Sequence, residues 1–267
     1  MLNKIFKTDK PIIGSLHFTP LLGYPNFKNI KKVLDAAIKD LEAFEKGGVN
    51  GIIVENNYDV PHKIEVGPET VACMSYLTSE IMKRTKLPVG VSVLWNDYKA
   101  ALSIARVCGA KFIRVPAFVD SVKTAYGTVI AEPKKVIEYR KKIGAENVLL
   151  FTDVQVKHAE MLEERPLSES IIEAIVNKSD AIIITGKWTG DAPNIEELKI
   201  ARDTAKDFPI FIGSGACKEN IKYLLKYANG IIISTSLKEG SNIFGETNLK
   251  SFKQRVSADK VKDLKNG

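Results

Sequence analysis

His17-Phe18-Thr19-Pro20-Leu21-Leu22-Gly23 follows the first apolar run of the chain, and this stretch decides between two folds. A doubly wound nucleotide-binding sheet carries a Gly-x-Gly-x-x-Gly turn at this place, because the glycines let the backbone approach a pyrophosphate group. The stretch holds a single glycine, at its end. The sequence therefore favours the other α/β fold with repeated strands and helices, the (β/α)8 or TIM barrel.

Eight short apolar runs rich in β-branched residues recur along the 267 residues, and each is followed by a helical pattern. The runs are continuous rather than alternating, which is typical of parallel strands covered on both faces. No linker or low-complexity segment separates them, so we expect one TIM-barrel domain over residues 1–267. The expected strands are residues 11–16, 51–54, 88–94, 112–116, 148–151, 181–184, 209–212 and 230–233.

The segments between these runs have the spacing of helices. Apolar residues recur three and four positions apart from Ile30 onward, which predicts an amphipathic helix over residues 30–46. Gly47 and Gly48 follow it, and glycine is a common residue at the end of a helix. Pro68 is expected to begin the next helix, because the first helical position tolerates proline.

The composition excludes several classes of protein. Hydrophobic residues make up 45% and charged residues 27% of the chain, which is ordinary for a folded soluble protein. No apolar run approaches the roughly 18–20 residues that span a membrane, and the N-terminal residues show no signal-peptide pattern. The three cysteines, Cys73, Cys108 and Cys217, are too dispersed for a disulfide framework or a zinc site. We therefore expect a protein of the reducing cytoplasm.

The net charge of +7 raises the question of nucleic-acid binding. The lysines are spread over helix faces and the C-terminal segment, without an arginine-rich stripe or interleaved aromatic residues. We therefore expect no nucleic-acid partner. The lysine-rich C-terminal segment leaves open a weak peripheral contact with an anionic membrane.

Candidate catalytic residues follow the predicted strands, because the carboxyl ends of barrel strands converge on one mouth. Glu55 and Asp153 follow near-opposite strands and can divide acid and base work. Arg114 and Lys157 would then stabilise developing negative charge. The alternative is that one carboxylate forms a buried ion pair with Arg114 or Lys157. A Schiff-base role for Lys157 or Lys187 is disfavoured, because neither lies in a strongly apolar run that would lower its pKa.

All three histidines, His17, His62 and His158, also fall after predicted strands. We expect His17 or His158 to assist the proton transfer. A second possibility is that one of them binds a divalent metal together with Glu55 or Asp153. The sequence leaves the identity of the metal, and of any other cofactor, unknown.

Glycines and small hydroxyl residues follow the last two predicted strands. Gly213, Ser214 and Gly215 allow the backbone to turn tightly and approach a ligand. Thr235 and Ser236 stand where a short helix would present free N–H groups. Many barrels bind phosphate with these two loops, so we predict a phosphate cradle there. Further residues expected to line the pocket are Asn56, Asn96 and Thr185.

A set of motifs recurs in order at nearly every strand end, from about residue 11 to about residue 238. The motifs are PIIGSLH (11–17), GIIVEN (51–56) with DVP (59–61), LPVGV (87–91) with ND (96–97), FIRV (112–115), DVQVKHA (153–159), TG (185–186) with TG (189–190), GSG (213–215) and TSLK (235–238). Together they resemble the BtpA (photosystem I biogenesis) family. The family is similar to barrels of the ribulose-phosphate-binding type, so the resemblance implies that fold and supports the cradle.

The resemblance also names residues. One departure from the family pattern is Lys187-Trp188, which occupies a stretch where small residues are expected. Lys187 is therefore a weak catalytic candidate that would instead tune this chain's own ligand. The residues that match the family motifs are His17, Glu55, Asn56, Asp97, Arg114, Asp153, Lys157, His158, Gly213, Gly215, Thr235 and Ser236.

Three hypotheses for the function remain. The first is an enzyme, an isomerase, lyase or hydrolase, that acts on a small phosphorylated sugar or nucleoside-like metabolite by acid–base chemistry. The second, from the family's name, is a non-catalytic factor for photosystem I biogenesis or assembly, but the sequence shows no exposed apolar patch for a partner. The third is a barrel that binds a phosphorylated effector without turnover. Association into a homo-oligomer is left open.

Overall fold

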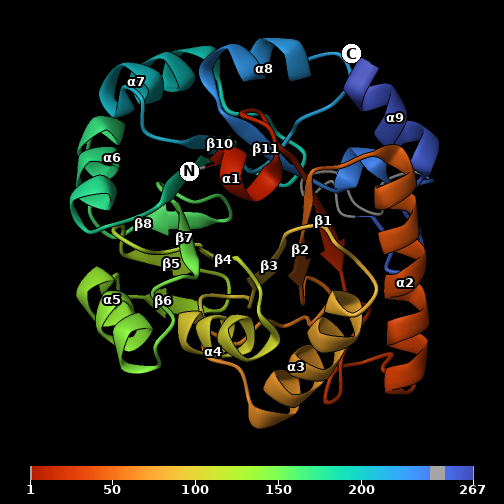
Figure 1. Cartoon of the computed structure of the whole chain (residues 1–267). Helices are drawn as coiled ribbons and strands as arrows, with labels where there is room; N and C mark the ends of the chain where they lie inside the picture. The colour runs from red at the N-terminus through yellow and green to blue at the C-terminus, as the bar shows by residue number, and fades with distance from the viewer. Residues whose placement is uncertain (1, 241–249, 267) are drawn as a thin grey trace.

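Eight parallel strands close into a ring in the order β1-β11-β10-β9-β7-β4-β3-β2 (Figure 1). This computed structural model describes residues 2–240 and 250–266. The prediction of a (β/α)8 barrel is confirmed. The barrel strands are β1 (Ile12–His17), β2 (Gly51–Glu55), β3 (Val89–Ser92), β4 (Phe112–Val115), β7 (Leu149–Asp153), β9 (Ala181–Ile184), β10 (Ile210–Ile212) and β11 (Gly230–Ile233).

Helices surround this ring on its outer face, as Figure 1 shows. The pattern changes after β11, where a short 3-10 helix, η1 (Thr235–Leu237), precedes α9 (Ala258–Asn266), and α9 packs against α2. The helices between the barrel strands are α2 (Ile30–Gly47), α3 (Pro68–Met82), α4 (Tyr98–Cys108), α5 (Pro133–Lys142), α6 (Leu167–Val176), α7 (Ile195–Ala205) and α8 (Ile221–Tyr227).

The helix ends follow from local chemistry. Asn29 precedes α2, and its side chain accepts a hydrogen bond from the backbone N–H of Lys32 at 3.0 Å. Gly48 ends the same helix at φ 84°, a conformation that favours glycine. The predicted helix over residues 30–46 is thus confirmed, and α3 begins at Pro68 as expected.

Alternate residues of the barrel strands point into the ring and form layers. The layer at the amino-terminal end is apolar and fully buried. The rings of Phe112 and Phe151 lie 4.6 Å apart, and those of Phe151 and Phe211 lie 4.8 Å apart. The strand residues of this layer are Ile13, Ile53, Phe112, Phe151, Ala181, Ile183, Phe211 and Ile232.

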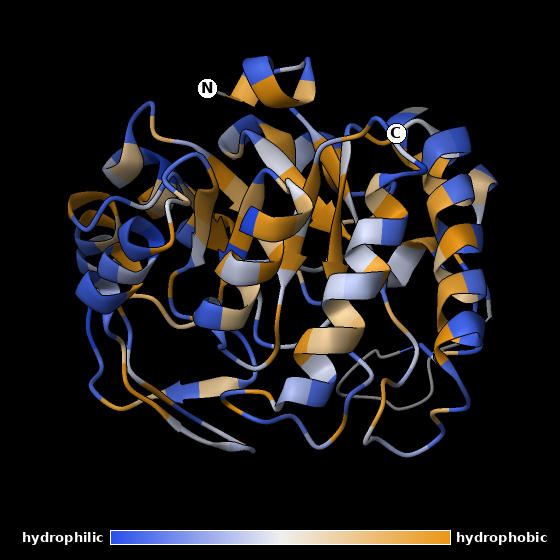
Figure 2. Ribbon diagram, turned by 60° about the horizontal axis from the view of Figure 1, so that its bottom comes forward, coloured by the Kyte–Doolittle hydropathy of each residue, from blue (hydrophilic) through white to orange (hydrophobic). Residues whose placement is uncertain are grey.

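Helix α1 (Leu2–Phe6) covers this end of the barrel. It crosses the middle of the ring in Figure 1 and stands beyond one end of the barrel in Figure 2. Leu2 and Phe6 join the apolar layer, and the Phe6 ring lies 5.8 Å from that of Phe112. The sequence did not predict this helix, because five residues are too few to show a helical period.

A second, antiparallel sheet was also not predicted. It has the order β6-β5-β8 and consists of β5 (Val122–Thr124), β6 (Gly127–Val129) and β8 (Ala159–Met161). Each strand has three residues, so neither alternation nor an apolar run marks it in the sequence. The sheet inserts after β4 and β7, beside the carboxyl ends of the barrel strands.

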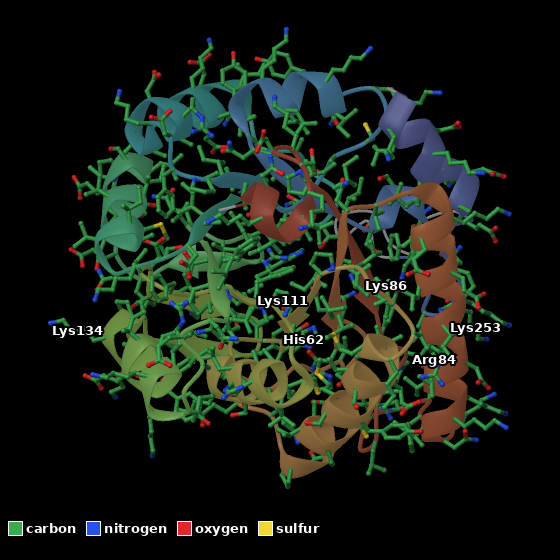
Figure 3. The ribbon with its side chains drawn as sticks, viewed as in Figure 1. His62, Arg84, Lys86, Lys111, Lys134 and Lys253 are labelled. Carbon is green, nitrogen blue, oxygen red and sulfur yellow. The ribbon has the colours of Figure 1, made fainter. Side chains whose placement is uncertain are left out.

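Basic side chains are spread over the surface. Of the basic residues that Figure 3 labels, Arg84, Lys86 and Lys253 lie on one side of the view and Lys134 lies on the opposite side. This distribution agrees with the diffuse positive charge read from the sequence. None of the helices in the described part of the chain combines the length and the apolar character needed to cross a membrane.

Candidate active site at the barrel mouth

On several strands a polar residue lies two positions beyond the apolar layer, toward the carboxyl end of the barrel. Because side chains alternate along a strand, Glu55 follows Ile53 into the ring, and Arg114 follows Phe112. His17 is the register partner of Glu55 across β1 and β2. The strands β1, β2 and β7 therefore extend further than predicted, since their polar last residues remain paired in the sheet.

Arg114 and Asp153 form a buried ion pair across β4 and β7. The guanidinium Nε donates to Oδ1 at 2.8 Å, and Nη2 donates to Oδ2 at 2.7 Å. This bidentate geometry holds the guanidinium in one orientation. Asp153 is the carboxylate that forms the ion pair left open as an alternative, and it is not among the residues that line the cavity. The pair orients Arg114, which does line the cavity, and a proton-transfer role for Asp153 stays a prediction.

Glu55 is the other buried carboxylate. It lines the cavity and makes no ion pair with any residue that the structure describes. Burial raises the pKa of Glu55, and the neighbouring charges of Arg114 and Lys157 oppose that rise. A carboxylate with a raised pKa is a stronger proton acceptor than an exposed one, so Glu55 is a candidate for proton exchange with a bound ligand.

Lys157 lies beside this carboxylate on the loop after β7. Its ammonium group donates to the carbonyl of Gly213 at 3.3 Å, and its backbone N–H donates to Oγ1 of Thr185 at 3.1 Å. Burial and then Arg114 lower the pKa of Lys157 to about 8. Lys157 is thus partly buried, although its sequence neighbours did not indicate this, whereas Lys187 is exposed and does not line the cavity.

The three histidines all line the same cavity. Burial lowers the pKa of His62 and of His158 to about 4, and it lowers the pKa of His17 well below the usual value. All three are therefore neutral near pH 7. His158 holds the next loop, since its Nε2 accepts from the backbone N–H of Thr189 at 3.2 Å. His158 thus positions a loop, and a proton-transfer role for it stays a prediction.

The predicted phosphate cradle lies at the rim of the cavity. A Cβ atom at Gly213 would lie 2.5 Å from Ile183, and Gly215 adopts φ +69° with the backbone of Ala192 close by. Both positions therefore require glycine. In the described part of the chain, the backbone N–H groups of Gly215 and Ser236 donate to no protein acceptor. These groups are free to bind an anion.

The hydroxyl groups of the cradle are used within the protein. Ser214 donates to the carbonyl of Asp191 at 2.7 Å, and Ser236 donates to that of Ala216 at 2.9 Å. Thr235 lines the cavity together with these two serines. The cradle would therefore bind an anion through its backbone rather than through Ser214 or Ser236.

The cavity between the polar residues at the strand ends and these loops has a volume of ≈ 560 Å³, within the usual range for small-ligand sites. Several polar atoms on its wall are buried without a hydrogen-bond partner among the described residues. They include Nδ1 of His17, Nδ1 of His62, Nδ2 of Asn57 and Oγ of Ser234. Buried polar groups are rarely left unpaired in folded proteins, so these atoms indicate a polar ligand.

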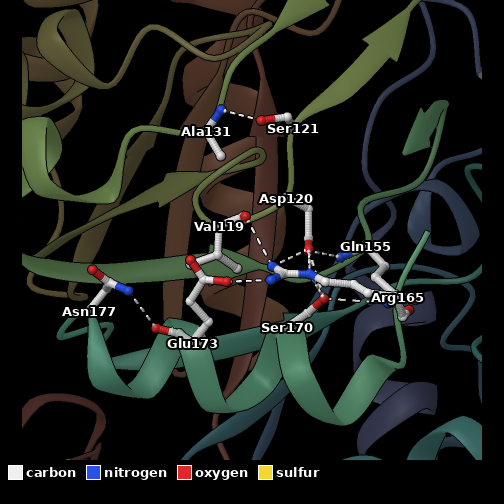
Figure 4. A network of polar contacts seen from close by, with 9 residues as sticks. All are labelled: Val119, Asp120, Ser121, Ala131, Gln155, Arg165, Ser170, Glu173 and Asn177. Atoms are coloured by element: carbon white, nitrogen blue, oxygen red, sulfur yellow. Dashed lines mark hydrogen bonds and ion pairs between the residues drawn. The ribbon is translucent and has the colours of Figure 1, made fainter. Parts of the chain in front are cut away.

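A network around Arg165 supports the loop that carries Lys157 (Figure 4). Arg165 pairs with Asp120 at 2.6 Å and with Glu173 of α6. Asp120 also accepts from the backbone N–H of Gln155 at 2.8 Å, and Gln155 adopts φ +48°. This network holds a strained residue next to the candidate site. The sequence does not predict this network, because no motif links residues so far apart in the chain.

Three residues expected to line the pocket do not line it. Asn56 binds the backbone of Leu94, accepting from its N–H at 2.7 Å. Asn96 binds both backbone groups of Ala117, and Thr185 accepts from Lys157. Their polar atoms bind the backbone of neighbouring loops, and a contact of these residues with a ligand stays a prediction.

The sequence also left a divalent metal open. Among the residues that the structure describes, no three His, Cys, Asp or Glu side chains gather closely enough to hold a metal ion. A metal therefore stays a prediction. Residues that line the cavity but were not proposed as ligands from the sequence are Asn57, His62, Trp95, Tyr126 and Trp188.

The closed ring and the charged side chains at its carboxyl end place the molecule in the class of (β/α)8 barrels. Solved structures with this fold include N-(5'-phosphoribosyl)anthranilate isomerase from Pyrococcus furiosus, with 15% identity, a TM-score of 0.53, and coverage of 96% of this chain and 100% of that chain. KGPDC from Streptococcus mutans has 10% identity, a TM-score of 0.56 and coverage of 96% of both chains. At such identities the likeness shows the fold alone.

Within this class, the chain belongs to the BtpA family, whose model matches residues 8–260. Photosystem I biogenesis protein BtpA from Synechocystis sp. is 38% identical, over 91% of this chain and 85% of that protein. An uncharacterized protein from Archaeoglobus fulgidus is 36% identical, over 89% of this chain and 95% of its own length. The putative sgc region protein SgcQ from Escherichia coli is 29% identical, over 96% of this chain and 97% of its own length.

Proposed function

We propose that this protein is an enzyme that binds a small phosphorylated sugar or nucleoside-like metabolite and catalyses proton transfer on it. The observation that carries the proposal is the convergence of three charged residues on one cavity: Glu55 and Arg114, which are buried, and Lys157, which is partly buried. Burying such charges costs stability, so a functional role is a reason to keep them. The free N–H groups of the cradle at the rim fit the phosphate.

The charges divide the chemical work between them. Glu55 acts as the base, because its raised pKa makes the carboxylate a better proton acceptor than an exposed one. Lys157 in its ammonium form and Arg114 stabilise the negative charge that develops on the ligand. Asp153 keeps Arg114 oriented toward the ligand. Isomerases and lyases of sugar phosphates use such steps, and so do some hydrolases.

The fold neighbours support this choice of ligand. The name of N-(5'-phosphoribosyl)anthranilate isomerase contains a phosphorylated substrate, and that protein shares the barrel at 15% identity. The support is by analogy of fold. The charges and the cradle of this chain provide the independent argument.

The experiment incubates the protein in D2O with a panel of sugar phosphates and 5′-ribonucleotides. Proton NMR then follows solvent deuterium entering carbon positions of the ligand, and calorimetry measures binding. We expect at least one panel member to bind and to exchange. Glu55→Gln should slow that exchange by at least ~100-fold while binding persists, because the base is lost and the cradle is kept.

The matched control is Glu160→Gln, because Glu160 is an exposed glutamate of β8. It should exchange at the rate of the unaltered protein. Two outcomes would contradict the proposal: no phosphorylated compound binds, or the Glu55→Gln variant exchanges as fast as the control.

A second candidate function is a non-catalytic factor, as the name of the Synechocystis relative suggests. One observation favours it. Ile172 and Val176 of α6 and Ile195 of α7 are exposed apolar side chains on two helices that pack together. The sequence does not reveal these exposed side chains, because exposure depends on which faces of a helix its neighbours leave uncovered. Binding without deuterium exchange in the experiment above would favour this candidate.

A further inference from the structure

Two aromatic pairs stand at the cavity wall, and the proposed acid–base chemistry does not use them. His62 follows β2, and its ring packs edge-on against Tyr126 with the centroids 5.0 Å apart. His158 follows β7, and its ring packs against Trp188 with the centroids 5.3 Å apart. All four rings line the cavity, so each pair presents a ring surface to its interior.

The two pairs come from four separate segments that the fold brings together. Tyr126 belongs to the turn between β5 and β6, which is part of the inserted antiparallel sheet. That sheet packs on Trp95, a further aromatic residue of the cavity wall. His62 and His158 line the same cavity, and His62 contributes to the lowering of the pKa of His158.

Each pair is held in place by contacts of its own. Thr189 binds His158 through its backbone N–H, at 3.2 Å, and its Oγ1 lies 2.8 Å from the same ring nitrogen. This contact fixes the loop that carries Trp188, although that side chain is 39% exposed. An exposed tryptophan costs solvation free energy unless a ligand covers it. The Trp188 side chain is therefore placed to contact a ligand that occupies the cavity.

Unpaired polar atoms accompany the rings. Nδ1 of His62 and Nδ2 of Asn57 are buried without a partner among the described residues, and both lie on the loop after β2. A planar heterocycle would cover the ring faces and present hydrogen-bonding atoms at its edge to the two nitrogens.

We propose that the ligand is a phosphorylated ribose that carries a planar heterocycle such as a nucleobase. The heterocycle lies against Trp188 and Tyr126 with its edge toward His62, and the phosphate lies at the cradle of Gly215 and Ser236. This proposal rests on the proposed function and narrows its substrate class. The ribose then spans the floor, where Glu55 and Lys157 lie.

The test compares the dissociation constants of ribose 5-phosphate, adenosine 5′-monophosphate, cytidine 5′-monophosphate and adenosine, measured by calorimetry on the full chain. Stacking of one base on an aromatic side chain accounts for a roughly 10-fold or larger gain in affinity. We therefore expect at least one nucleotide to bind about 10-fold or more tightly than ribose 5-phosphate.

Trp188→Leu should remove most of this advantage and leave the affinity for ribose 5-phosphate unchanged, whereas Trp188→Phe should keep it. Tyr76→Leu is the matched control, because Tyr76 is an exposed aromatic residue of α3 outside the cavity wall. It should bind every compound as the unaltered protein does.

The outcomes separate the two proposals. If ribose 5-phosphate binds as tightly as both nucleotides, the heterocycle proposal is overturned and the proposed function stands. The same holds if Trp188→Leu does not weaken nucleotide binding. If adenosine binds as tightly as its 5′-monophosphate, or if none of the phosphorylated compounds binds, the phosphate cradle and the proposed function fail together.

Discussion

Lys157 illustrates how single residues set the chemistry of the barrel mouth. The charged groups that face it are Arg114 of β4, Asp153 of β7, Glu55 of β2 and Asp191 of the loop after β9. The three carboxylates favour its ammonium form, but burial and Arg114 outweigh them and lower its pKa to about 8. The amine therefore loses its proton within reach of neutral pH.

We predict that two lysines titrate near pH 8. Lys238 is the second, because it is 1% exposed and burial lowers its pKa to about 8. In protein with 13C-labelled lysine, the Cε resonances of these two lysines should shift with midpoints about 2.5 pH units below the ordinary value of 10.5. Lys157→Met should remove one of them and Lys238→Met the other. A titration in which every resonance shifts near the ordinary value of 10.5 contradicts this prediction.

The same two lysines give the stability a pH dependence of known sign. The unfolded chain titrates near the ordinary value of 10.5, so it binds more protons than the folded chain between pH 8 and that value. Their contribution therefore makes the free energy of unfolding rise with pH across this window.

The sequence located the charged residues of the site but not their partners. Glu55, Arg114 and Asp153 each end or nearly end a strand that the apolar runs had marked. Which carboxylate binds Arg114 depended on strand adjacency and side-chain reach, and β7 is the direct neighbour of β4. The sequence placed His62 after a strand. It did not predict that His62 packs on Tyr126, because Tyr126 belongs to the antiparallel sheet of β5, β6 and β8, which no sequence pattern marks.

At the scale of elements, long segments were predictable and short ones were not. The eighteen residues of α2 contain enough turns to show their period, and Asn29 and Gly48 mark its ends. The three-residue strands β5, β6 and β8 are stabilised by pairing with one another, which no local pattern reveals. The Arg165 network adds further contacts in this region, because it joins the loops beside this sheet to α6.

We predict that Arg165→Met lowers the free energy of unfolding by about 3 kcal/mol, measured by urea denaturation. The reason is that the side chain of Asp120 is 3% exposed and would lose its cation. The variant should also bind phosphorylated ligands more weakly, because Asp120 holds Gln155 near Lys157. In contrast, Arg84→Met breaks an exposed pair with Glu80 and should cost less than about 1 kcal/mol. Equal losses in the two variants would contradict the assigned role of the network.

At the scale of the whole molecule, the two ends of the barrel differ in character. The amino-terminal end is apolar and is covered by α1, while the carboxyl end carries the charges and the cavity. Stability and ligand binding are therefore expected to respond to different substitutions.

We predict that Phe6→Ala lowers the free energy of unfolding by about 3 kcal/mol, because Phe6 is 2% exposed and its loss leaves a hole beside Phe112 and Phe151. Affinity for phosphorylated ligands should not change. Thermal or urea denaturation and calorimetry check the two parts. Lys4→Ala alters an exposed residue of the same helix and should change stability by less than about 0.5 kcal/mol. A Phe6→Ala variant that loses affinity but not stability would show that the two ends are coupled.

The phenylalanine layer also determines how ligands enter and leave the cavity. Phe112, Phe151 and Phe211 fill the barrel axis below the cavity, and Phe6 packs beneath them. A compound that reaches the floor must leave by the opening through which it arrived. Arriving and departing molecules therefore exclude one another, so any released product is expected to act as a competitive inhibitor.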